Sequence, residues 1–289
     1  MNKPHRDTIC VEEAEIISHD AWPGNQYILR ILAEGIAADA KPGSFVHLTV
    51  DPQRPMRRPI SIMRANPKTG MVDLLYKVVG EGTTLLSHRK PGERINVMGP
   101  IGNGFTVDQT RSLPLLIGGG VGMPPMIFLA EHYTELAGYH PFVILGSEVP
   151  FPFQAEPSKL IIPGMPDGVI AGVPLLEEWG IPSRLTSLQG YPGCHEGYVT
   201  DLARQWLDAM DESDRKQVII YSCGPHPMLE AVAKLAKAYN LPCQVSLEEF
   251  MACAVGGCAG CVVKVETDTG PAMKRVCVDG PVFEAATVF

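Results

Sequence analysis

Four cysteines near the end of the chain constrain its fold more than any other feature. They follow the spacing Cys253-x4-Cys258-x2-Cys261-x15-Cys277. A C-x4-C-x2-C run with a distant fourth cysteine is the pattern of plant-type [2Fe–2S] proteins. The small residues between these cysteines allow the backbone to wrap closely around a cluster and to donate N–H groups to its sulfurs. The sequence therefore predicts that the four cysteines ligate a [2Fe–2S] cluster.

Two other metal centres use cysteine ligands. A Rieske centre needs two histidines, and none of the eight histidines lies beyond His226. A structural zinc site with four cysteine ligands is the remaining alternative. Zinc ribbons favour paired C-x2-C segments, and this stretch contains a single pair, so we prefer the iron–sulfur interpretation.

Charge and hydropathy exclude several classes of partner. The chain has 24 Lys and Arg against 32 Asp and Glu, a net charge of −8, which disfavours nucleic acids and anionic membranes. No window reaches the roughly 18 uninterrupted apolar residues of a membrane span. Residues 1–15 turn acidic where a signal peptide needs an apolar core. We therefore expect a cytoplasmic protein whose eight cysteines are not a disulfide framework.

The chain changes character twice. Short strands expected at 43–50, 73–79 and 94–98, separated by Gly and Pro, predict a β-barrel or sandwich in residues 1–108. Strands at 113–117, 142–145 and 217–221 alternate with helices at 125–136 and 227–239, which predicts a doubly wound parallel sheet in 109–243. Residues 147–195 read as a Pro- and Gly-rich insertion with little regular structure. Residues 244–289 are too few to build a core of their own.

Two segments of the first region suit a flavin. Arg58, Pro59, Ile60 and Ser61 combine a guanidinium with a hydroxyl, a pair able to hold a pyrophosphate. About twenty residues later a strand runs into Gly80, Gly82 and Thr83, a turn whose free N–H groups would cradle phosphate. Each segment alone is typical of an ordinary turn. The two together predict a flavin site.

Two turns of the second region suit a dinucleotide. Residues 118–122 read GGGVG between a strand and a helix, where phosphates meet helix N–H groups. The dinucleotide fingerprint is only partly met, because Met123 follows these glycines. Cys223 begins a Cys-Gly-Pro turn with the same strand-to-helix placement. Its thiol is a candidate for a catalytic role near a bound nicotinamide, although a buried, unreactive thiol is the commoner outcome. Glu148 follows the second strand, where an acid would favour NAD over NADP, or it is a solvated loop residue.

These segments together resemble the ferredoxin–NADP reductase superfamily and, within it, the electron-transfer subunits of NAD-linked, heterotetrameric dihydroorotate dehydrogenases. The resemblance rests on residues 58–61, 79–83, 118–122, 223–225, 246–253 and 277–283. It implies FAD on Arg58, Pro59, Ile60, Ser61, Leu75, Tyr76, Lys77, Gly82 and Thr83. It implies NAD(H) on Gly118, Gly119, Gly120, Gly122, Cys223, Gly224 and Pro225, and [2Fe–2S] on Cys253, Cys258, Cys261 and Cys277.

The resemblance also implies an architecture and a partner. It predicts a β-barrel flavin domain at 1–108, an α/β nucleotide domain at 109–243 and a small cluster domain at 244–289. Electrons would pass from dihydroorotate through the FMN of a catalytic subunit, then the cluster, then FAD, to NAD+, in a 2+2 heterotetramer of pyrimidine biosynthesis. Phe250, Met251 and Val255 are candidates for the docking surface, unless they pack against this chain.

Two departures from the family leave the nucleotide preference and the partner open. The Pro- and Gly-rich segment after the second strand of the nucleotide region is longer than usual, and that strand ends differently. The second strand of the nucleotide region ends in Leu-Gly-Ser-Glu at 145–148, where the family has a Gly-x-Arg-like turn. The alternatives are a reductase of the same architecture that serves a hydrogenase, a ferredoxin or an oxygenase, and a zinc-stabilised binding module without redox activity.

Overall fold

The computed structural model describes residues 7–51 and 54–289. Contacts divide the chain into two compact units. The first combines the chain up to Phe105 with Ser246–Phe283 and Val288, and the second contains Thr106–Val245, Glu284–Thr287 and Phe289. The segment with the four cysteines thus belongs to the same unit as the N-terminal region. The three-part division at residues 108 and 243 stays a prediction.

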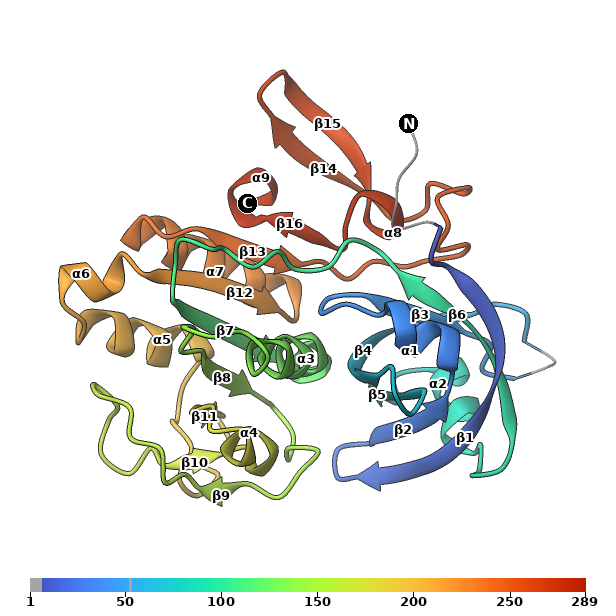
Figure 1. Ribbon diagram of the computed structural model, residues 1–289, viewed down its shortest axis with the longest axis horizontal. Coiled ribbons are helices and arrows are strands. Elements are labelled where there is room, and N and C mark those ends of the chain that lie inside the picture. Colours follow the sequence, from blue (N-terminus) through green and yellow to red (C-terminus); the bar gives the residue numbers. More distant parts are fainter. Residues whose placement is uncertain (1–6, 52–53) are drawn as a thin grey trace. The chain divides into compact units, whose positions relative to one another are not determined.

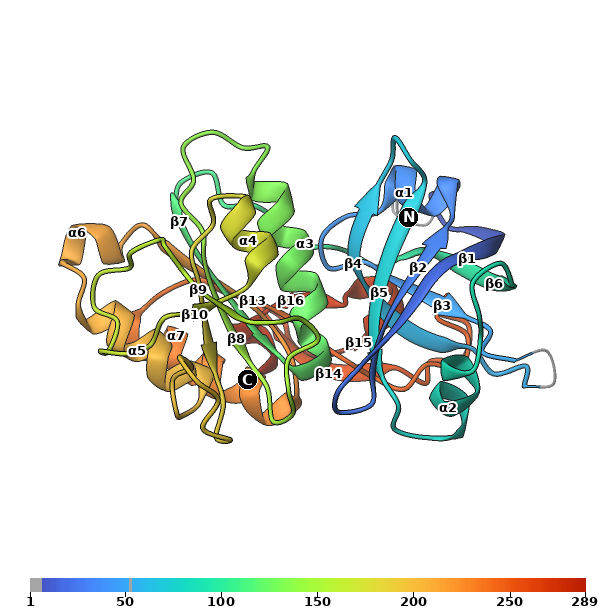
Figure 2. The same ribbon diagram turned by 90° about the horizontal axis from the view of Figure 1, so that it is seen from below.

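The first unit is built on a closed barrel of six antiparallel strands in the order β1-β2-β5-β4-β3-β6. Figure 2 shows these strands wrapping around one another. Their bounds are β1 (Cys10–Trp22), β2 (Gln26–Leu32), β3 (Phe45–Leu48), β4 (Arg58–Asn66), β5 (Met71–Lys77) and β6 (Arg94–Ile101), with helices α1 (Glu34–Asp39) and α2 (Glu81–Ser87). The expected barrel is confirmed.

The barrel closes because its strands turn apolar side chains inward. Ile16 of β1, Leu29 and Ile31 of β2, Ile62 of β4 and Leu74 of β5 are completely buried. Burying one such side chain contributes roughly 1.5–3 kcal/mol. The interior of the barrel is therefore filled by side chains. A ligand of this unit would have to bind at the strand ends and connecting turns.

The cysteine segment adds a hairpin and a short helix to this unit. Strands β14 (Val262–Thr267) and β15 (Gly270–Arg275) pair in antiparallel register, and α8 (Val276–Asp279) follows. The Asn103 side chain donates to the carbonyls of Val278 (3.3 Å) and Asp279 (3.0 Å). The Asn103 bonds attach the segment to the end of the barrel. The Leu247 N–H donates to the Pro281 carbonyl at 2.9 Å, which joins the two ends of the segment itself.

The second unit contains a six-stranded sheet in the order β11-β8-β7-β12-β13-β16. Its parallel pairs β11·β8, β8·β7 and β7·β12 form the expected doubly wound sheet. Helices α5 and α7 cover one face and α3 covers the other (Figure 1). The elements are β7 (Leu113–Gly119), the 3-10 turn η2 (Gly120–Gly122), α3 (Met123–Tyr133), β8 (Phe142–Gly146), β11 (Ser183–Thr186), α5 (Val199–Asp208), α6 (Glu212–Arg215), β12 (Val218–Cys223), α7 (His226–Tyr239), β13 (Cys243–Ser246), β16 (Val282–Glu284) and α9 (Ala285–Val288).

Residues 147–195 hold more regular structure than expected. They contain the short pair β9 (Glu156–Pro157) and β10 (Ala171–Gly172), helix α4 (Pro174–Glu178) and the sheet strand β11. The sequence pattern does not predict strand β11, because the strand includes the charged residue Arg184. In the structure Arg184 is only 4% exposed. Its guanidinium donates to the carbonyls of Ser183 and Leu160, both at 2.7 Å. An arginine whose terminal nitrogens both donate to backbone carbonyls can be buried where composition suggests a surface loop.

Within residues 7–51 and 54–289, no helix combines the length and apolar character needed to cross a lipid bilayer.

Candidate redox sites

The two segments expected to hold a flavin meet in the first unit. Arg58 opens β4, and its guanidinium lies against Gly82 in the first turn of α2. A Cβ added at Gly82 would lie 2.5 Å from Arg58 Nη2 and 2.7 Å from its Cζ. The Arg58 Nη1 also donates to the Met56 carbonyl at 2.9 Å. The guanidinium and the helix start therefore lie together in one cradle, and its occupation by FAD stays a prediction.

Thr83 occupies part of this cradle. Its hydroxyl oxygen accepts from the N–H groups of Val79 (3.0 Å) and Gly80 (3.3 Å), and its O–H donates to the Gly80 carbonyl at 3.0 Å. The N–H groups of Val79 and Gly80 are therefore already bonded within the chain, and the phosphate-binding role of this turn stays a prediction. The N–H groups of the first helical turn have no intrahelical acceptor, and they include those of Glu81 and Gly82.

The other candidate flavin residues line adjoining strands. Pro59, Ile60 and Ser61 continue β4, while Leu75, Tyr76 and Lys77 end β5, and the register pairs Ile62 with Leu74. Leu75 and Tyr76 are buried. This pairing places the two triplets side by side at one end of the barrel.

The Tyr76 side chain belongs to an aromatic cluster of the barrel. Its ring stacks on Tyr27, with 5.4 Å between ring centroids and 14° between planes, and its hydroxyl is 2.8 Å from His19 Nε2. Burial, together with Tyr27, raises the pKa of Tyr76 far above its ordinary value. The phenol therefore stays protonated, and it is the backbone of Tyr76 that remains for a ligand.

In the second unit the two glycine turns lie side by side. The register pairs Gly118 with Cys223, so β7 and β12 end at the same edge of the sheet. A Cβ at Gly122 would collide with the Cys223 carbonyl oxygen, and one at Gly119 would collide with Met228 Sδ. These glycines allow the two turns to touch. In open parallel sheets this edge is where nucleotides bind.

Three further residues of this edge bear on the nucleotide expectations. Cys223 is 1% exposed, which places its thiol within protein. Gly120 has a φ of +55°, and a Cβ there would meet nothing within 4 Å, so its backbone faces open space. Glu148 is exposed just beyond β8. The roles of Cys223 and Glu148 stay predictions.

The hairpin explains the long spacing between the third and fourth cysteines. Its 14 residues fill most of the x15 gap and fold back so that the Val276 N–H donates to the Cys261 carbonyl at 2.9 Å. The sulfurs of Cys261 and Cys277 come within 3.3 Å, and the Cys277 N–H points to Cys261 Sγ at 3.5 Å. Both residues are buried.

The first two cysteines lie on a tight loop. The Cys258 N–H donates to Cys253 Sγ, and the Gly260 N–H donates to Cys258 Sγ, both at 3.4 Å. Ala254 and Ala259 have φ values of +55° and +53°, a left-handed conformation that turns peptide N–H groups toward the sulfurs. That conformation costs an alanine roughly 1–2 kcal/mol, so the surrounding loop holds these residues in it.

The loop changes the acidity of its thiols. Burial raises the pKa of Cys253, but hydrogen bonds from the N–H groups of Cys258, Val255 and Gly257 outweigh it and lower the pKa to about 7. Burial and the neighbouring Cys261 raise the pKa of Cys277 to about 12. A thiolate is the form that binds metal, so Cys253 is prepared for ligation at neutral pH.

The cysteine segment fits an iron–sulfur cluster chemically. In the part of the chain that the structure describes, the sulfurs form two pairs, and no three Cys, His, Asp or Glu side chains form a group able to hold a single metal ion. The donor set nevertheless consists of thiols with backbone N–H groups directed at three of the sulfurs. Such N–H contacts are typical of iron–sulfur sites.

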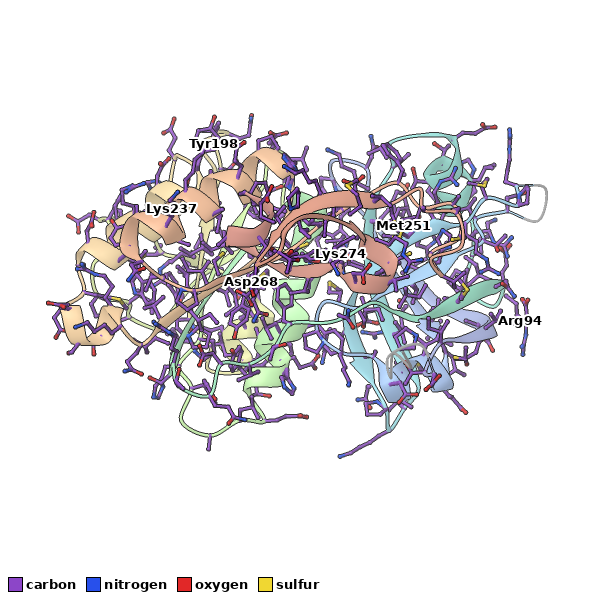
Figure 3. The ribbon with its side chains drawn as sticks, turned by 90° about the horizontal axis from the view of Figure 1, so that it is seen from above. Arg94, Tyr198, Lys237, Met251, Asp268 and Lys274 are labelled. Carbon is purple, nitrogen blue, oxygen red and sulfur yellow. The ribbon has the colours of Figure 1, made fainter. Side chains whose placement is uncertain are left out.

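The expected docking residues separate into two kinds. Phe250 is 94% exposed, whereas Met251, labelled in Figure 3, is 9% exposed and packs within its own unit. Val255 is half-buried. Of the three, Phe250 offers an apolar surface to a partner.

Comparison with known proteins agrees with this geometry. Residues 8–105 match the family described as oxidoreductase FAD-binding domain. Residues 248–289 match the iron–sulfur cluster binding domain of dihydroorotate dehydrogenase B. The chain is 34% identical, over 96% of its length and 98% of the relative's, to the "dihydroorotate dehydrogenase B (NAD(+)), electron transfer subunit" of Geobacillus sp. (strain WCH70). The chain belongs to this family. The same subunit of Bacillus caldolyticus is 36% identical over 86% of both chains.

Solved structures agree with the fold of this electron transfer subunit. A structure titled as an NADH-dependent reduced ferredoxin-NADP oxidoreductase superposes with a TM-score of 0.77 and 26% identity, over 96% of this chain and 90% of that one. A ferredoxin reductase in carbazole 1,9a-dioxygenase has a TM-score of 0.62 at 20% identity, over 81% of this chain and 67% of that one. The ferredoxin reductase-like fold and the family that the sequence resembles are both confirmed.

Proposed function

We propose that this chain transfers electrons between the FMN of a dihydroorotate dehydrogenase catalytic subunit and NAD+, using a [2Fe–2S] cluster and FAD, in a cytoplasmic 2+2 heterotetramer. Dihydroorotate loses two electrons and two protons to become orotate, NAD+ takes both electrons and one proton, and the other proton passes to solvent. Bound FAD supplies the exchange between single electrons and pairs that joins a cluster to a nicotinamide. The chain itself does not bind orotate.

The observation that carries this proposal is that one compact unit holds both the flavin cradle and the four cysteines. Asn103, two residues beyond β6, donates to carbonyls just after Cys277. The two sites therefore lie in one unit, and the Asn103 bonds attach the cysteine segment to the end of the barrel.

The residues of the barrel have distinct roles in this proposal. Arg58 neutralises the FAD pyrophosphate, and the first-turn N–H groups of Glu81 and Gly82 bind its oxygens. Pro59, Ile60, Ser61, Leu75, Tyr76 and Lys77 present backbone groups to the flavin ring. Thr83 holds the turn in shape through its bonds to Val79 and Gly80.

The sheet edge of the second unit is assigned to NAD(H). The contacting turns that contain Gly118, Gly119, Gly120, Gly122, Cys223, Gly224 and Pro225 would receive the dinucleotide, with its phosphates at the start of α3. Gly120 supports this because its surroundings are open. Glu148 lies where an acid favours a ribose 2′-hydroxyl over a 2′-phosphate, which supports NAD as the nucleotide.

The partner approaches the cysteine loop in this proposal. Gly257, Cys258, Ala259 and Gly260 are exposed, and they carry little side-chain bulk, so a second redox centre can come close to the cluster. Phe250, at 94% exposure, supplies an apolar contact beside them.

A second candidate is a reductase of the same architecture that serves another partner, such as a ferredoxin, a hydrogenase or an oxygenase. The observation that favours it is the 0.77 TM-score, at 26% identity, to the ferredoxin-NADP oxidoreductase structure. A zinc-stabilised binding module would lack the visible absorption of flavin and iron–sulfur centres. The visible spectrum of pure protein tests that third possibility.

Co-expression with an FMN-containing dihydroorotate dehydrogenase subunit distinguishes the first two candidates. We expect the two chains to elute together in gel filtration and to reduce NAD+ with dihydroorotate. Separate elution and no activity, with FAD, FMN and iron all loaded, would overturn the pyrimidine assignment in favour of the second candidate.

A further inference from the structure

Arg275 connects the two cysteine pairs. It is the last residue of β15, paired with Val262, which follows Cys261 directly. Its guanidinium reaches back across the segment, and Nη1 donates to the Gly256 carbonyl at 2.9 Å. Gly256 lies between Cys253 and Cys258. One side chain thus ties the loop of the first two cysteines to the hairpin that carries the other two.

The carbonyl that Arg275 contacts belongs to the loop whose N–H groups face the cysteine sulfurs. Gly256 lies two residues before Cys258, whose N–H donates to Cys253 Sγ at 3.4 Å. The Gly256 carbonyl and the Gly257 N–H share one peptide group, and a donor on the carbonyl polarises that peptide. The guanidinium therefore holds and polarises the stretch of backbone that curls around the Cys253 sulfur.

Gly256 is held from other directions as well. Its φ is +83°, and a Cβ there would lie 2.5 Å from Val278 Cγ2 and 3.3 Å from Arg275 Nη1. Because Val278 fills the near side and Arg275 bonds the carbonyl, Gly256 sits in one defined position between both cysteine pairs.

The charge of Arg275 is only partly compensated. Its backbone N–H donates to Asp279 Oδ2 at 2.9 Å, while the Nε of its guanidinium is 4.0 Å from the same oxygen. The Arg275 guanidinium, held by its hydrogen bond to Gly256, therefore places a positive charge beside the cysteine loop.

We infer that Arg275 is a positioning residue for the iron–sulfur cluster, which holds the Gly256–Gly257 peptide against the cysteine sulfurs and raises the reduction potential of the cluster. This inference rests on the proposed cluster at the four cysteines. Two physical effects act in the same direction. Hydrogen bonds to the sulfurs and nearby positive charge both stabilise the reduced, more negative cluster.

The test compares Arg275→Gln and Arg275→Lys with the control Lys274→Gln, in the full-length protein. Lys274 is the adjacent residue on β15, labelled in Figure 3, and its substitution removes one positive charge without touching the Gly256 bond. The reduction potential is measured by anaerobic titration, with the cluster followed by electron paramagnetic resonance. Iron release to a chelator is measured on the same samples.

Arg275→Gln should lower the potential, raising the oxidised-to-reduced ratio at the wild-type midpoint by about three- to tenfold; tenfold is 59 mV for a one-electron couple. Arg275→Lys keeps the charge and should recover at least half of that shift. Iron release should be about tenfold faster in Arg275→Gln, as for other residues that support metal ligands. Lys274→Gln should change either quantity less than twofold.

Several results would overturn the inference. Unchanged potential and iron release in Arg275→Gln, or an equal shift in Lys274→Gln, would show that Arg275 has no specific role. If Arg275→Gln retains no cluster, the control decides, and loss of the cluster in Lys274→Gln as well would contradict the inference. A wild-type protein that has no iron and no resonance signal refutes the proposed cluster itself, independently of Arg275.

Discussion

The guanidinium of Arg58 lies so close to Gly82 that a Cβ at residue 82 would be 2.5 Å from Nη2. The contact joins two residues that are more than twenty positions apart in the sequence, one at the start of β4 and one in α2, and it places one positive charge over the first turn of α2. An anion bound at that turn would meet the guanidinium and the helix N–H groups together.

Gly82→Ala should therefore displace the Arg58 guanidinium and weaken FAD binding by about tenfold, the effect of losing roughly 1.4 kcal/mol of binding free energy. Flavin fluorescence measures the dissociation constant. Gly80→Ala is the matched control, because a Cβ at Gly80 meets nothing within 4 Å and its φ of −171° suits any residue. Equal affinities in the two variants would contradict the assigned cradle.

Gly122→Ala should destabilise the second unit. Its Cβ would collide with the Cys223 carbonyl oxygen, so the β7 and β12 turns must separate, and overpacking of this kind costs about 1–3 kcal/mol. A fall in melting temperature together with a higher Michaelis constant for NADH is expected. Gly120→Asn, at an open left-handed position that asparagine tolerates, should melt closer to the wild type. A Gly122→Ala protein as stable as the wild type would show that the turns do not need this contact.

Cys258→Ser should remove the cluster and leave FAD bound. Cys258 is exposed, so the change leaves the buried core intact, while the cluster loses a thiolate ligand. Iron analysis and flavin absorbance of the purified variant measure the two cofactors. NADH should still reduce the flavin. Loss of flavin together with iron in a folded protein would contradict the division between the cradle and the cysteine loop.

His47 should make stability depend on acid pH. Burial, followed by the charge of Arg57, lowers its pKa to about 4, below the ordinary value near 6.5. Between these two pH values the unfolded chain binds a proton that the folded chain does not. Stability should therefore fall as pH drops from about 6.5 to 4, by at most about 3 kcal/mol.

Urea unfolding of the wild type and of His47→Leu, at several pH values across that window, isolates this contribution, because all other titrating groups are common to both proteins. The free energy of unfolding of His47→Leu should depend less steeply on pH. Parallel curves would show that His47 ionises equally in the folded and unfolded chains.

Local patterns were enough to predict much of this fold. The helix expected at 227–239 is α7 (His226–Tyr239), and the strand expected at 113–117 is the start of β7. Each shows its own periodicity or its own run of apolar residues. The cysteine motif can likewise be recognised without knowledge of the tertiary structure, because cysteines on one loop are close together in the sequence.

Other features depend on contacts between distant residues. Strand β11 is hidden by the buried Arg184, whose partners include the carbonyl of Leu160, 24 residues away. The Thr83 hydroxyl accepts hydrogen bonds from two backbone N–H groups, a contact that the glycine-rich sequence of this turn does not reveal. Met251 looks like a docking residue in sequence but is buried within its unit. Arg275 lies far enough from Gly256 in sequence that only the hairpin reveals their bond.

The most direct test of the whole account is anaerobic titration of the purified complex with NADH, followed by optical absorbance and electron paramagnetic resonance. The account predicts that NADH bleaches the flavin and generates the resonance of a reduced [2Fe–2S] cluster, and that Cys258→Ser shows the bleaching alone. A bleached flavin with no cluster signal, in a protein that contains its full iron, would contradict electron transfer through this chain.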